Sequence, residues 1–398
     1  MNGLVSNKQI TRTQTTWIAY ILLAVYAYFL NILGPITPFL SAELNLSYTI
    51  SSLHFSAFAV GILAVGMVGN ILIRHTGRQR ALSIGAIGLG FGALLLTVGR
   101  SPFVTIGASF LMGCVGSLIL AVVPVLLSDE HGEMRAVAIS EANVLSSLVS
   151  AFAALLVGWF AGLIIGWRSA LILVAVISIG LGVRFNHPFR SEKVQRSPLQ
   201  LRSPLPLIYW LYWIALVLAV AIEFCMVFWS ADYMERELGM LRSSAAQTVS
   251  LFLAGMITGR LLSSWILRYL EAHIIVLASC LLGLLSFIIY WRAENALVGM
   301  IGLVLTGFFV SCLYPLLLSI AIGSAKGNTI QAGARATLAS GTAILILPLV
   351  LGCLADLIGL RGAFVVVAVL YVALLLMVLI ATKMPSGQPG DDKNYPTG

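Results

Sequence analysis

The sequence has few charged residues. Only 10% of its 398 residues are Asp, Glu, Lys or Arg, whereas 60% are hydrophobic. Soluble globular domains carry about 25% charged residues. So small a share cannot cover a surface that faces water, which excludes a soluble globular fold and indicates that lipid is the solvent. In lipid each backbone polar group needs a partner within the protein, which leaves α-helices or closed β-barrels.

Several chemical motifs are also missing. The sequence contains no GxxxxGK[ST] phosphate loop, no HExxH pair and no GYG filter, and its five histidines are scattered. The five cysteines lie in apolar runs without a CxxC pair, so we interpret them as packing residues. The sequence therefore predicts no cofactor, no metal, no ATP drive and no potassium channel. No clustered catalytic set is present, so we expect a protein that is not an enzyme.

Long apolar runs are what the sequence has instead. A helix needs about 20 residues to cross a hydrocarbon core of about 30 Å, and these runs are too long for barrel strands. The first run, which begins near Thr15, is too long for the apolar part of a signal peptide, so we expect it to be retained. We expect twelve membrane spans, at residues 15–40, 48–73, 80–99, 103–128, 136–164, 167–185, 206–231, 243–268, 274–291, 295–325, 332–358 and 361–383.

The basic residues are distributed unevenly between the loops. Twelve spans place both termini on one side, and 17 of the 23 Lys and Arg residues fall on that side. Positive loops stay in the cytoplasm, so we predict two cytoplasmic termini in an inner (plasma) membrane. The net charge of +8 is then explained by orientation and by anionic lipid headgroups rather than by nucleic acid.

The longest polar stretch between spans, residues 186–205, lies midway along the chain. We interpret residues 1–185 and 206–385 as two six-helix bundles, 186–205 as a cytoplasmic linker and 386–398 as a disordered tail. A weak repeat supports two halves, because AGLIIGWRSAL (161–171) resembles ADLIGLRGAF (355–364) at an offset of about 193 residues. Such an offset is typical of parallel halves related by an axis along the membrane normal.

The stretch GNILIRHTGRQR (69–80) resembles the G-x-x-x-D-R-x-G-R-R loop of the major facilitator superfamily. Gly77 and Arg78 match this motif, whereas Arg74 stands where the family has its aspartate. Arg74 and Arg78 are therefore candidate gating residues, in a loop that lacks the acidic member of the family's latch. GMITGRLLSSWILRY (255–269) and GFFVSCLYPLLLSIA (307–321) resemble the fucose and sugar permease branch more weakly.

The resemblance implies an all-α membrane fold of twelve transmembrane helices in two pseudo-symmetric six-helix bundles. It also implies solute binding between the bundles and alternating access. The sugar branch favours uptake of a sugar or a similar polar metabolite. The proton-coupling carboxylates that the branch carries in spans one and four are not found here, and span one offers Asn31 instead.

Glu223 is the strongest candidate for a functional residue. It lies well inside span 206–231, in LAVAIEFCMVFWS, with no charged neighbour in sequence. A charge inside a membrane is costly and therefore marks a functional site by default. A carboxyl group removed from water can bind and release a proton near neutral pH. We expect Glu223 to couple transport to protons or, alternatively, to be held by a partner such as Arg260.

Other ionisable residues lie within or close to spans. Arg260 is near the middle of span 243–268, where it could clamp an anionic solute or neutralise Glu223. Glu141, near the start of span 136–164, is a candidate gate residue or a partner of Arg135. Arg335 is expected to be a gate residue on the cytoplasmic side or to extend its charge toward water.

Polar and aromatic residues complete the candidate binding site. At the 193-residue offset Asn31 falls beside Glu223, so both should line one central cavity. Asn31 is expected to contact solute or to hydrogen-bond another helix. Tyr28, Trp229 and Tyr314 could stack on a sugar ring or serve in packing.

The sequence thus predicts a secondary transporter, monomeric and surrounded by membrane lipid, that moves a small-molecule solute and, through Glu223, protons. Efflux of an amphipathic compound remains open as an alternative, and so does a receptor that does not transport. A cavity rich in polar groups would favour uptake of a polar metabolite, whereas an apolar cavity with a single acid would favour efflux.

Overall fold

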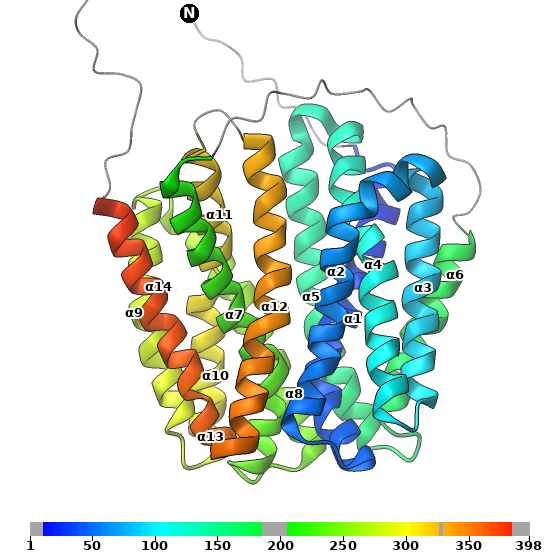
Figure 1. Cartoon of the computed structure of the whole chain (residues 1–398), viewed down its shortest axis with the longest axis vertical. Helices are drawn as coiled ribbons and strands as arrows, with labels where there is room; N and C mark the ends of the chain where they lie inside the picture. Colours follow the sequence, from blue (N-terminus) through cyan, green and yellow to red (C-terminus); the bar gives the residue numbers. More distant parts are fainter. Residues whose placement is uncertain (1–10, 185–204, 326–328, 384–398) are drawn as a thin grey trace, which may run out of the picture.

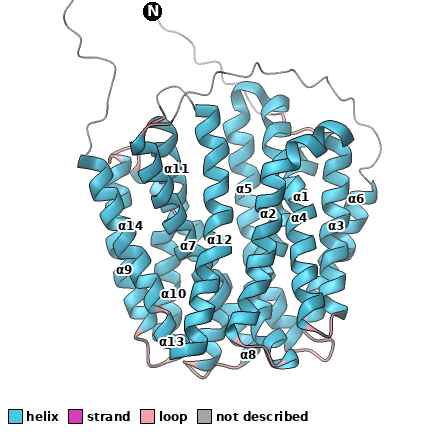
Figure 2. Cartoon of the chain, in the orientation of Figure 1, coloured by secondary structure: helices cyan, strands magenta, loops and turns pink. Residues whose placement is uncertain are grey.

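The computed structural model describes residues 11–184, 205–325 and 329–383, which form helices joined by short loops (Figures 1 and 2). The expected linker 186–205, except for its last residue, and the expected tail 386–398 lie outside the described residues. The helices of the first half are α1 (Gln14–Leu44), α2 (Tyr48–Thr76), α3 (Arg78–Val98), α4 (Pro102–His131), α5 (Arg135–Ala161) and α6 (Arg168–Arg184), with a 3₁₀ turn, η1 (Gly132–Met134), before α5.

The second half repeats this arrangement with two interrupted spans. Its helices are α7 (Leu207–Arg236), α8 (Arg242–Ile266), α9 (Ala272–Trp291), α10 (Ala296–Val310), α11 (Leu313–Gly323), α12 (Thr329–Ile358), α13 (Leu360–Ala363) and α14 (Val365–Lys383). Eleven segments of the described chain are long and apolar enough to cross a membrane, and α6, with 17 residues, is the twelfth. The all-α fold with twelve spans is confirmed.

Span ten, which the sequence places at 295–325, is interrupted. It consists of α10 and α11, which are separated at Ser311 and Cys312. Pro315 has no backbone N–H, and in a continuous helix that N–H would bind the carbonyl four residues earlier, at Ser311. The proline therefore leaves the Ser311 carbonyl oxygen available to other donors.

Short polar side chains define several helix starts. The side-chain oxygens of Thr13, Ser47 and Asn295 accept hydrogen bonds from the backbone N–H three residues later, at 3.2, 3.2 and 3.0 Å. Each bond satisfies one of the backbone donors that a first helical turn leaves free. Gly77, at a φ of 84°, ends α2 and begins α3.

The twelve spans form two bundles that meet along six helices, three from each bundle. In the first bundle α3 packs on α4 and α6, and in the second α9 packs on α10 and α14. Between the bundles α1 packs on α7 and α8, α2 on α12 and α5 on α8. The start of α1 and the end of α14 both lie toward the top of Figure 1. We call this the terminus end, and the end where α1 leads into α2 the far end.

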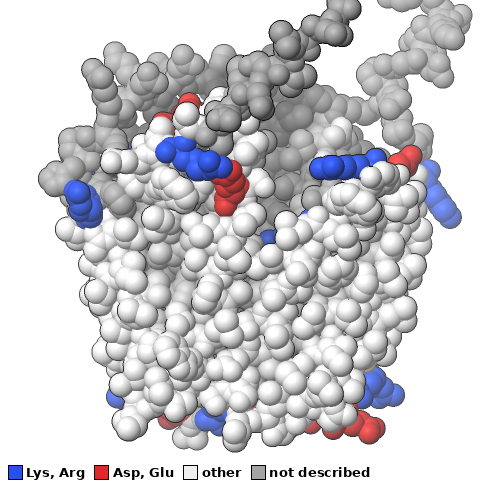
Figure 3. Space-filling view, turned by 180° about the vertical axis from the view of Figure 1, so that it is seen from behind, with Lys and Arg blue, Asp and Glu red and all other residues white. Residues whose placement is uncertain are grey.

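Charged side chains lie mostly near the two ends of the molecule. On the face shown in Figure 3, Lys, Arg, Asp and Glu are found close to the terminus end and the far end, with a broad uncharged band between them. Large apolar side chains such as Phe91, Val176 and Leu285 are more than half exposed in the spans. This band is the surface that a hydrocarbon core would cover.

A glycine makes possible a close backbone approach between the bundles. A Cβ atom at Gly34 of α1 would overlap the carbonyl oxygen of Val227 in α7. The absence of a side chain therefore allows the two helices to touch toward the far end.

Replacing Gly34 by alanine should destabilise this arrangement by about 1–3 kcal/mol, because the added methyl group overfills a packed contact. Thermal unfolding of the purified protein measures the effect as a lower Tm. Gly107→Ala is the matched control, because a Cβ there has no atom within 4 Å. Equal Tm values for the two variants would contradict the packing argument.

Candidate functional site

A small polar cavity lies between the two bundles, about halfway along the spans. Its volume is about 130 Å³. It is lined by Ala27 and Asn31 of α1, Asn143, Ser146, Ser147 and Ser150 of α5, Glu223 of α7, and Leu253, Met256 and Arg260 of α8. Three of the residues predicted to bind solute, Asn31, Glu223 and Arg260, are thus brought to one cavity from three helices.

Helix α5 contributes a stripe of polar residues that the sequence analysis missed. Asn143, Ser146, Ser147 and Ser150 recur at helical spacing, so they share one face of α5. The hydroxyls of Ser146 and Ser147 donate to the carbonyl four residues earlier, at 2.8 and 2.9 Å. Their oxygens remain able to accept hydrogen bonds from the cavity. The i, i+3, i+4, i+7 spacing was the signal available in the sequence.

Asn31 links α1 to this stripe. Its Nδ2 donates to the Ser150 hydroxyl at 3.0 Å and to the Ala27 carbonyl at 2.9 Å. The side-chain oxygen of Asn31 therefore remains as an acceptor at the cavity. Asn31 thus makes the expected hydrogen bond to another helix, and it also lines the expected cavity.

Arg260 connects the two bundles at the cavity. Its Nη1 donates to the Ser147 hydroxyl of α5 at 3.0 Å, and its Nε donates to the Ser311 carbonyl at 3.4 Å. The second acceptor is the carbonyl that Pro315 leaves without a helical partner. The break in span ten thus holds the guanidinium in place, and the charge lies at the boundary between α5 and α8.

Glu223 faces the same cavity without a close partner. Among the described residues, its carboxylate makes neither a hydrogen bond nor an ion pair, although it is half-buried. Glu223 interacts electrostatically with Arg260 and with Tyr314 of α11. An acid and a base therefore share one cavity at a separation longer than that of a direct ion pair.

Two aromatic candidates lie away from the cavity. The Tyr28 hydroxyl donates to the Ala170 carbonyl at 2.8 Å, and the Trp229 indole donates to the Pro348 carbonyl at 3.1 Å. Both side chains are almost fully buried. In this conformation they pack helices together, whereas the half-buried Tyr314 interacts electrostatically with Glu223.

Glu141 is paired with Arg12 and not with Arg135. Arg12 donates to its two carboxylate oxygens at 2.9 and 2.6 Å, and the Tyr20 hydroxyl donates at 2.9 Å. The hydrogen bond to this carboxylate raises the pKa of Arg12 above its ordinary value. The expected pairing with Arg135 was wrong, because Arg12, just before α1 and 129 residues away in sequence, lies beside Glu141 of α5.

The basic gate candidates lie near the terminus end. Arg78 forms an ion pair with Asp129 at the end of α4. The loop lacks the family's own aspartate, and an acid from another helix pairs with its arginine. Arg335 lies 5.3 Å from the Trp210 ring centre, and its carbonyl accepts from Trp213. The side chain of Arg74 is not among the described ones.

A second, wider hollow lies toward the terminus end between α1 and α5. Its volume is about 800 Å³, and it is open to the outside. Its walls are mainly apolar, with the Arg12–Glu141 pair among them; the lining residues are Arg12, Trp17, Tyr20, Val137, Ser140, Glu141, Val144, Leu145 and Leu148.

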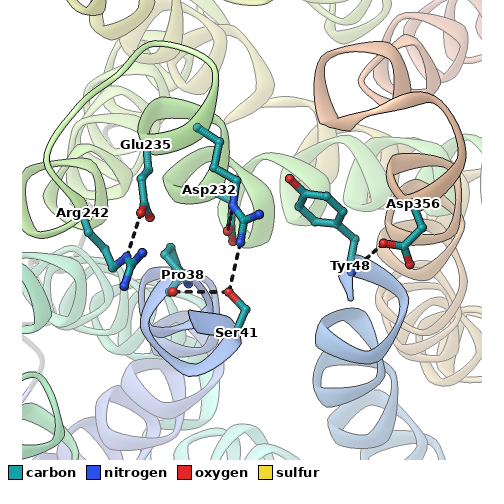
Figure 4. A network of polar contacts seen from close by, with 8 residues as sticks. Pro38, Ser41, Tyr48, Asp232, Glu235, Arg242 and Asp356 are labelled. Carbon is teal, nitrogen blue, oxygen red and sulfur yellow. Dashed lines mark hydrogen bonds and ion pairs between the residues drawn. The ribbon is translucent and has the colours of Figure 1, made fainter. Parts of the chain in front are cut away.

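The far end is closed by polar contacts between the bundles (Figure 4). Asp356 of α12 accepts hydrogen bonds from the backbone N–H groups of Tyr48 and Thr49 in the first turn of α2, at 2.9 and 2.8 Å. A carboxylate is stabilised at a helix N-terminus by the free donors and by the helix dipole. Asp356 therefore ties the second bundle to the first.

Two arginines extend this closure. Arg236 of α7 donates to the Ser41 hydroxyl of α1 at 3.4 Å and lies 5.0 Å from the Tyr48 ring centre. Arg236 is also paired with the buried Asp232 at 3.5 Å, and Arg242 with Glu235 at 2.8 Å. The paired acids come from α7, so the charges at this end are mutually compensated.

Aromatic rings fill the space between this closure and the cavity. Phe55 of α2 stacks on Phe228 of α7 with ring centres 4.0 Å apart, and Trp229 meets Phe55 edge-on at 5.7 Å. All three rings are fully buried. The path from the cavity to the far end is therefore blocked by both packing and charge.

Two helical bundles with a polar site between them, closed at one end, define a membrane transporter of the alternating-access class. The family model of the Major Facilitator Superfamily matches residues 19–325 and 213–397. The chain belongs to this superfamily, which confirms the resemblance seen in the sequence, and it is a secondary transporter.

Solved structures support the same fold. A bacterial homologue of the human lysosomal transporter Spinster, in an inward-facing and occupied conformation, aligns with a TM-score of 0.79 at 12% identity over 95% of this chain and 98% of that one. The nucleoside transporter NupG aligns with a TM-score of 0.70 at 12% identity over 94% and 99%. At such identities the likeness concerns the fold alone. No curated protein matches the sequence.

Replacing Asp356 by asparagine should weaken the closure of the far end. Hydrogen bonds to a charged group contribute about 1.5–3 kcal/mol, so the ratio of open to closed molecules should rise roughly tenfold or more. A cysteine at Ser52, which is fully buried beside Gly352, can report this as faster labelling by a membrane-impermeant maleimide once the native cysteines are replaced.

Glu294→Gln is the matched control, because Glu294 is an exposed acid in the loop between α9 and α10 at the same end. Its labelling rate should equal that of the parent. If Asp356→Asn also leaves the rate unchanged, Asp356 does not hold the far end closed.

Proposed function

We propose that the protein takes up a small polar metabolite across an inner membrane by alternating access, together with protons that bind Glu223. The observation that carries this proposal is the cavity lined by both bundles, in which Glu223 faces Arg260 without a direct partner. Binding there is accompanied by rocking of the bundles, which exposes the cavity to each side in turn.

The contacts at the two ends support access from one side in this conformation. The far end is closed by the Asp356 contacts and by the Phe55–Phe228 stack, whereas the wide hollow opens toward the terminus end. With cytoplasmic termini, as the distribution of Lys and Arg predicts, the hollow opens toward the cytoplasm and the closed end faces the opposite side.

The composition of the cavity favours a polar solute. Seven of its ten lining residues are polar or charged, which is the feature expected for uptake of a polar metabolite rather than for efflux through an apolar site. Sugars are among such solutes. Tyr28 and Trp229 are engaged in packing here, so ring stacking on a sugar would depend on Tyr314.

Efflux of an amphipathic compound is the second candidate function. The wide hollow between α1 and α5 favours it, because its mainly apolar wall and its single charged pair suit a molecule with both apolar and polar parts. A thermal-shift screen of the purified protein separates the two, since small polar metabolites stabilise an uptake site and amphipathic drugs an efflux site.

Glu223→Gln should abolish solute accumulation driven by a pH gradient in proteoliposomes while leaving solute exchange in place. Glutamine keeps the size and polarity of the side chain but cannot carry a proton. Glu271→Gln, at an exposed acid just before α9, is the control and should behave like the parent. Undiminished pH-driven accumulation in Glu223→Gln would remove Glu223 from the coupling step.

A further inference from the structure

The charges around the central cavity are nearly balanced. Glu223 brings one negative charge and Arg260 one positive charge, and the remaining polar lining residues are neutral amides and hydroxyls. The groups around Glu223 can be named helix by helix: Asn31 from α1, Asn143 from α5 and Arg260 from α8 share its cavity, and Tyr314 from α11 interacts with it electrostatically. Apart from Tyr314, whose phenol is neutral near pH 7, Arg260 is the ionisable member of this set.

An uncompensated charge is costly in a cavity removed from water. A neutral or zwitterionic solute leaves the site balanced only while Glu223 stays ionised, so its binding takes up no proton. A solute with one negative charge makes the site negative, and one proton on Glu223 restores the balance. A solute with two negative charges would need a second acid at the cavity, and the described lining offers none.

Resting on the proton-coupled uptake proposed above, we infer that the solute is a small monocarboxylate, bound by Arg260 and carried with one proton on Glu223. The anion and the proton enter the cavity as a neutral pair. The loaded site then has no net charge in the closed intermediate, in which it is sealed from water on both sides.

The guanidinium of Arg260 has the donors that such a solute requires. Two of its five N–H groups are used, by Ser147 and by the Ser311 carbonyl, and Nη2 donates to none of the described residues. A carboxylate matches the planar fork of an arginine with two parallel hydrogen bonds. Because Ser147 belongs to the other bundle, an anion on Arg260 also binds at the contact that joins α8 to α5.

The size and the lining of the cavity indicate which monocarboxylates it can hold. Its volume of about 130 Å³ corresponds to about four water molecules at about 30 Å³ each. The amide oxygen of Asn31 and the side chain of Asn143 can bind a hydroxyl or carbonyl substituent. The geometry therefore suits short hydroxy or oxo acids.

Purified full-length protein can be tested with glycolate, L-lactate and pyruvate as probes. L-Lactamide and L-alanine are matched to L-lactate in shape but are neutral and zwitterionic. Thermal shifts as a function of probe concentration should show binding of at least one monocarboxylate and no binding of the amide or the amino acid. On the alkaline side of the Glu223 titration, affinity for the anion should fall by about tenfold per pH unit, because each anion binds with one proton.

Variants at the two charges separate the roles. Glu223→Gln mimics the protonated acid, so it should bind the anion with an affinity that no longer depends on pH. Arg260→Gln should lose the thermal shift. Arg268→Gln, at an exposed arginine just beyond α8, should keep it. If Arg260→Gln does not fold, the pH profile of Glu223→Gln decides alone.

Binding of L-lactamide or L-alanine in place of the acids would overturn the inference. Absence of a shift with all three monocarboxylates, or a pH dependence that persists in Glu223→Gln, would do so too. Counterflow in proteoliposomes distinguishes failure of this inference from failure of the proposed function. Transport of a neutral solute would support the transport function and exclude a monocarboxylate as the solute. Anion binding without counterflow would support the anion site and contradict the transport function.

Discussion

Every backbone polar group that enters the membrane must find its partner inside the protein, and the architecture depends on this constraint. Helices satisfy their own backbone. The exceptions arise where the helix is broken, as at Pro315, which leaves the Ser311 carbonyl free. Arg260 Nε donates a hydrogen bond to this carbonyl oxygen, and the bond holds the guanidinium charge at the cavity. The carbonyl left free by the break and the half-buried guanidinium thus satisfy each other.

The two bundles are joined by contacts of different kinds along their length. At the far end, backbone donors of α2 meet the Asp356 carboxylate, and close packing at Gly34 and Phe55 fills the space beneath. At the cavity, the bundles share the Arg260–Ser147 bond. Such polar contacts can be exchanged for water or solute when the bundles rock, whereas the apolar interfaces inside each bundle persist.

Much of the site could be read from sequence because intramembrane polar residues are rare and expensive. Asn31, Glu223 and Arg260 stood out on that ground, and the half-chain offset paired Asn31 with Glu223. Serines do not stand out in this way, since a hydroxyl can satisfy its own helix, as Ser146 and Ser147 do. The partner of Glu141 was misjudged because Arg12 reaches it from the chain just before α1, over a separation of 129 residues.

Hydropathy and loop charge are properties of local composition, so the solvent of the chain, the twelve spans and the common side of both ends could be predicted from the residues alone. The packed helices were needed to show which polar groups share a cavity, which end is closed and that Tyr28 and Trp229 pack away from the cavity. These outcomes depend on the rotation and tilt of each helix against its neighbours. Those are set by the sum of many weak contacts between residues far apart in sequence.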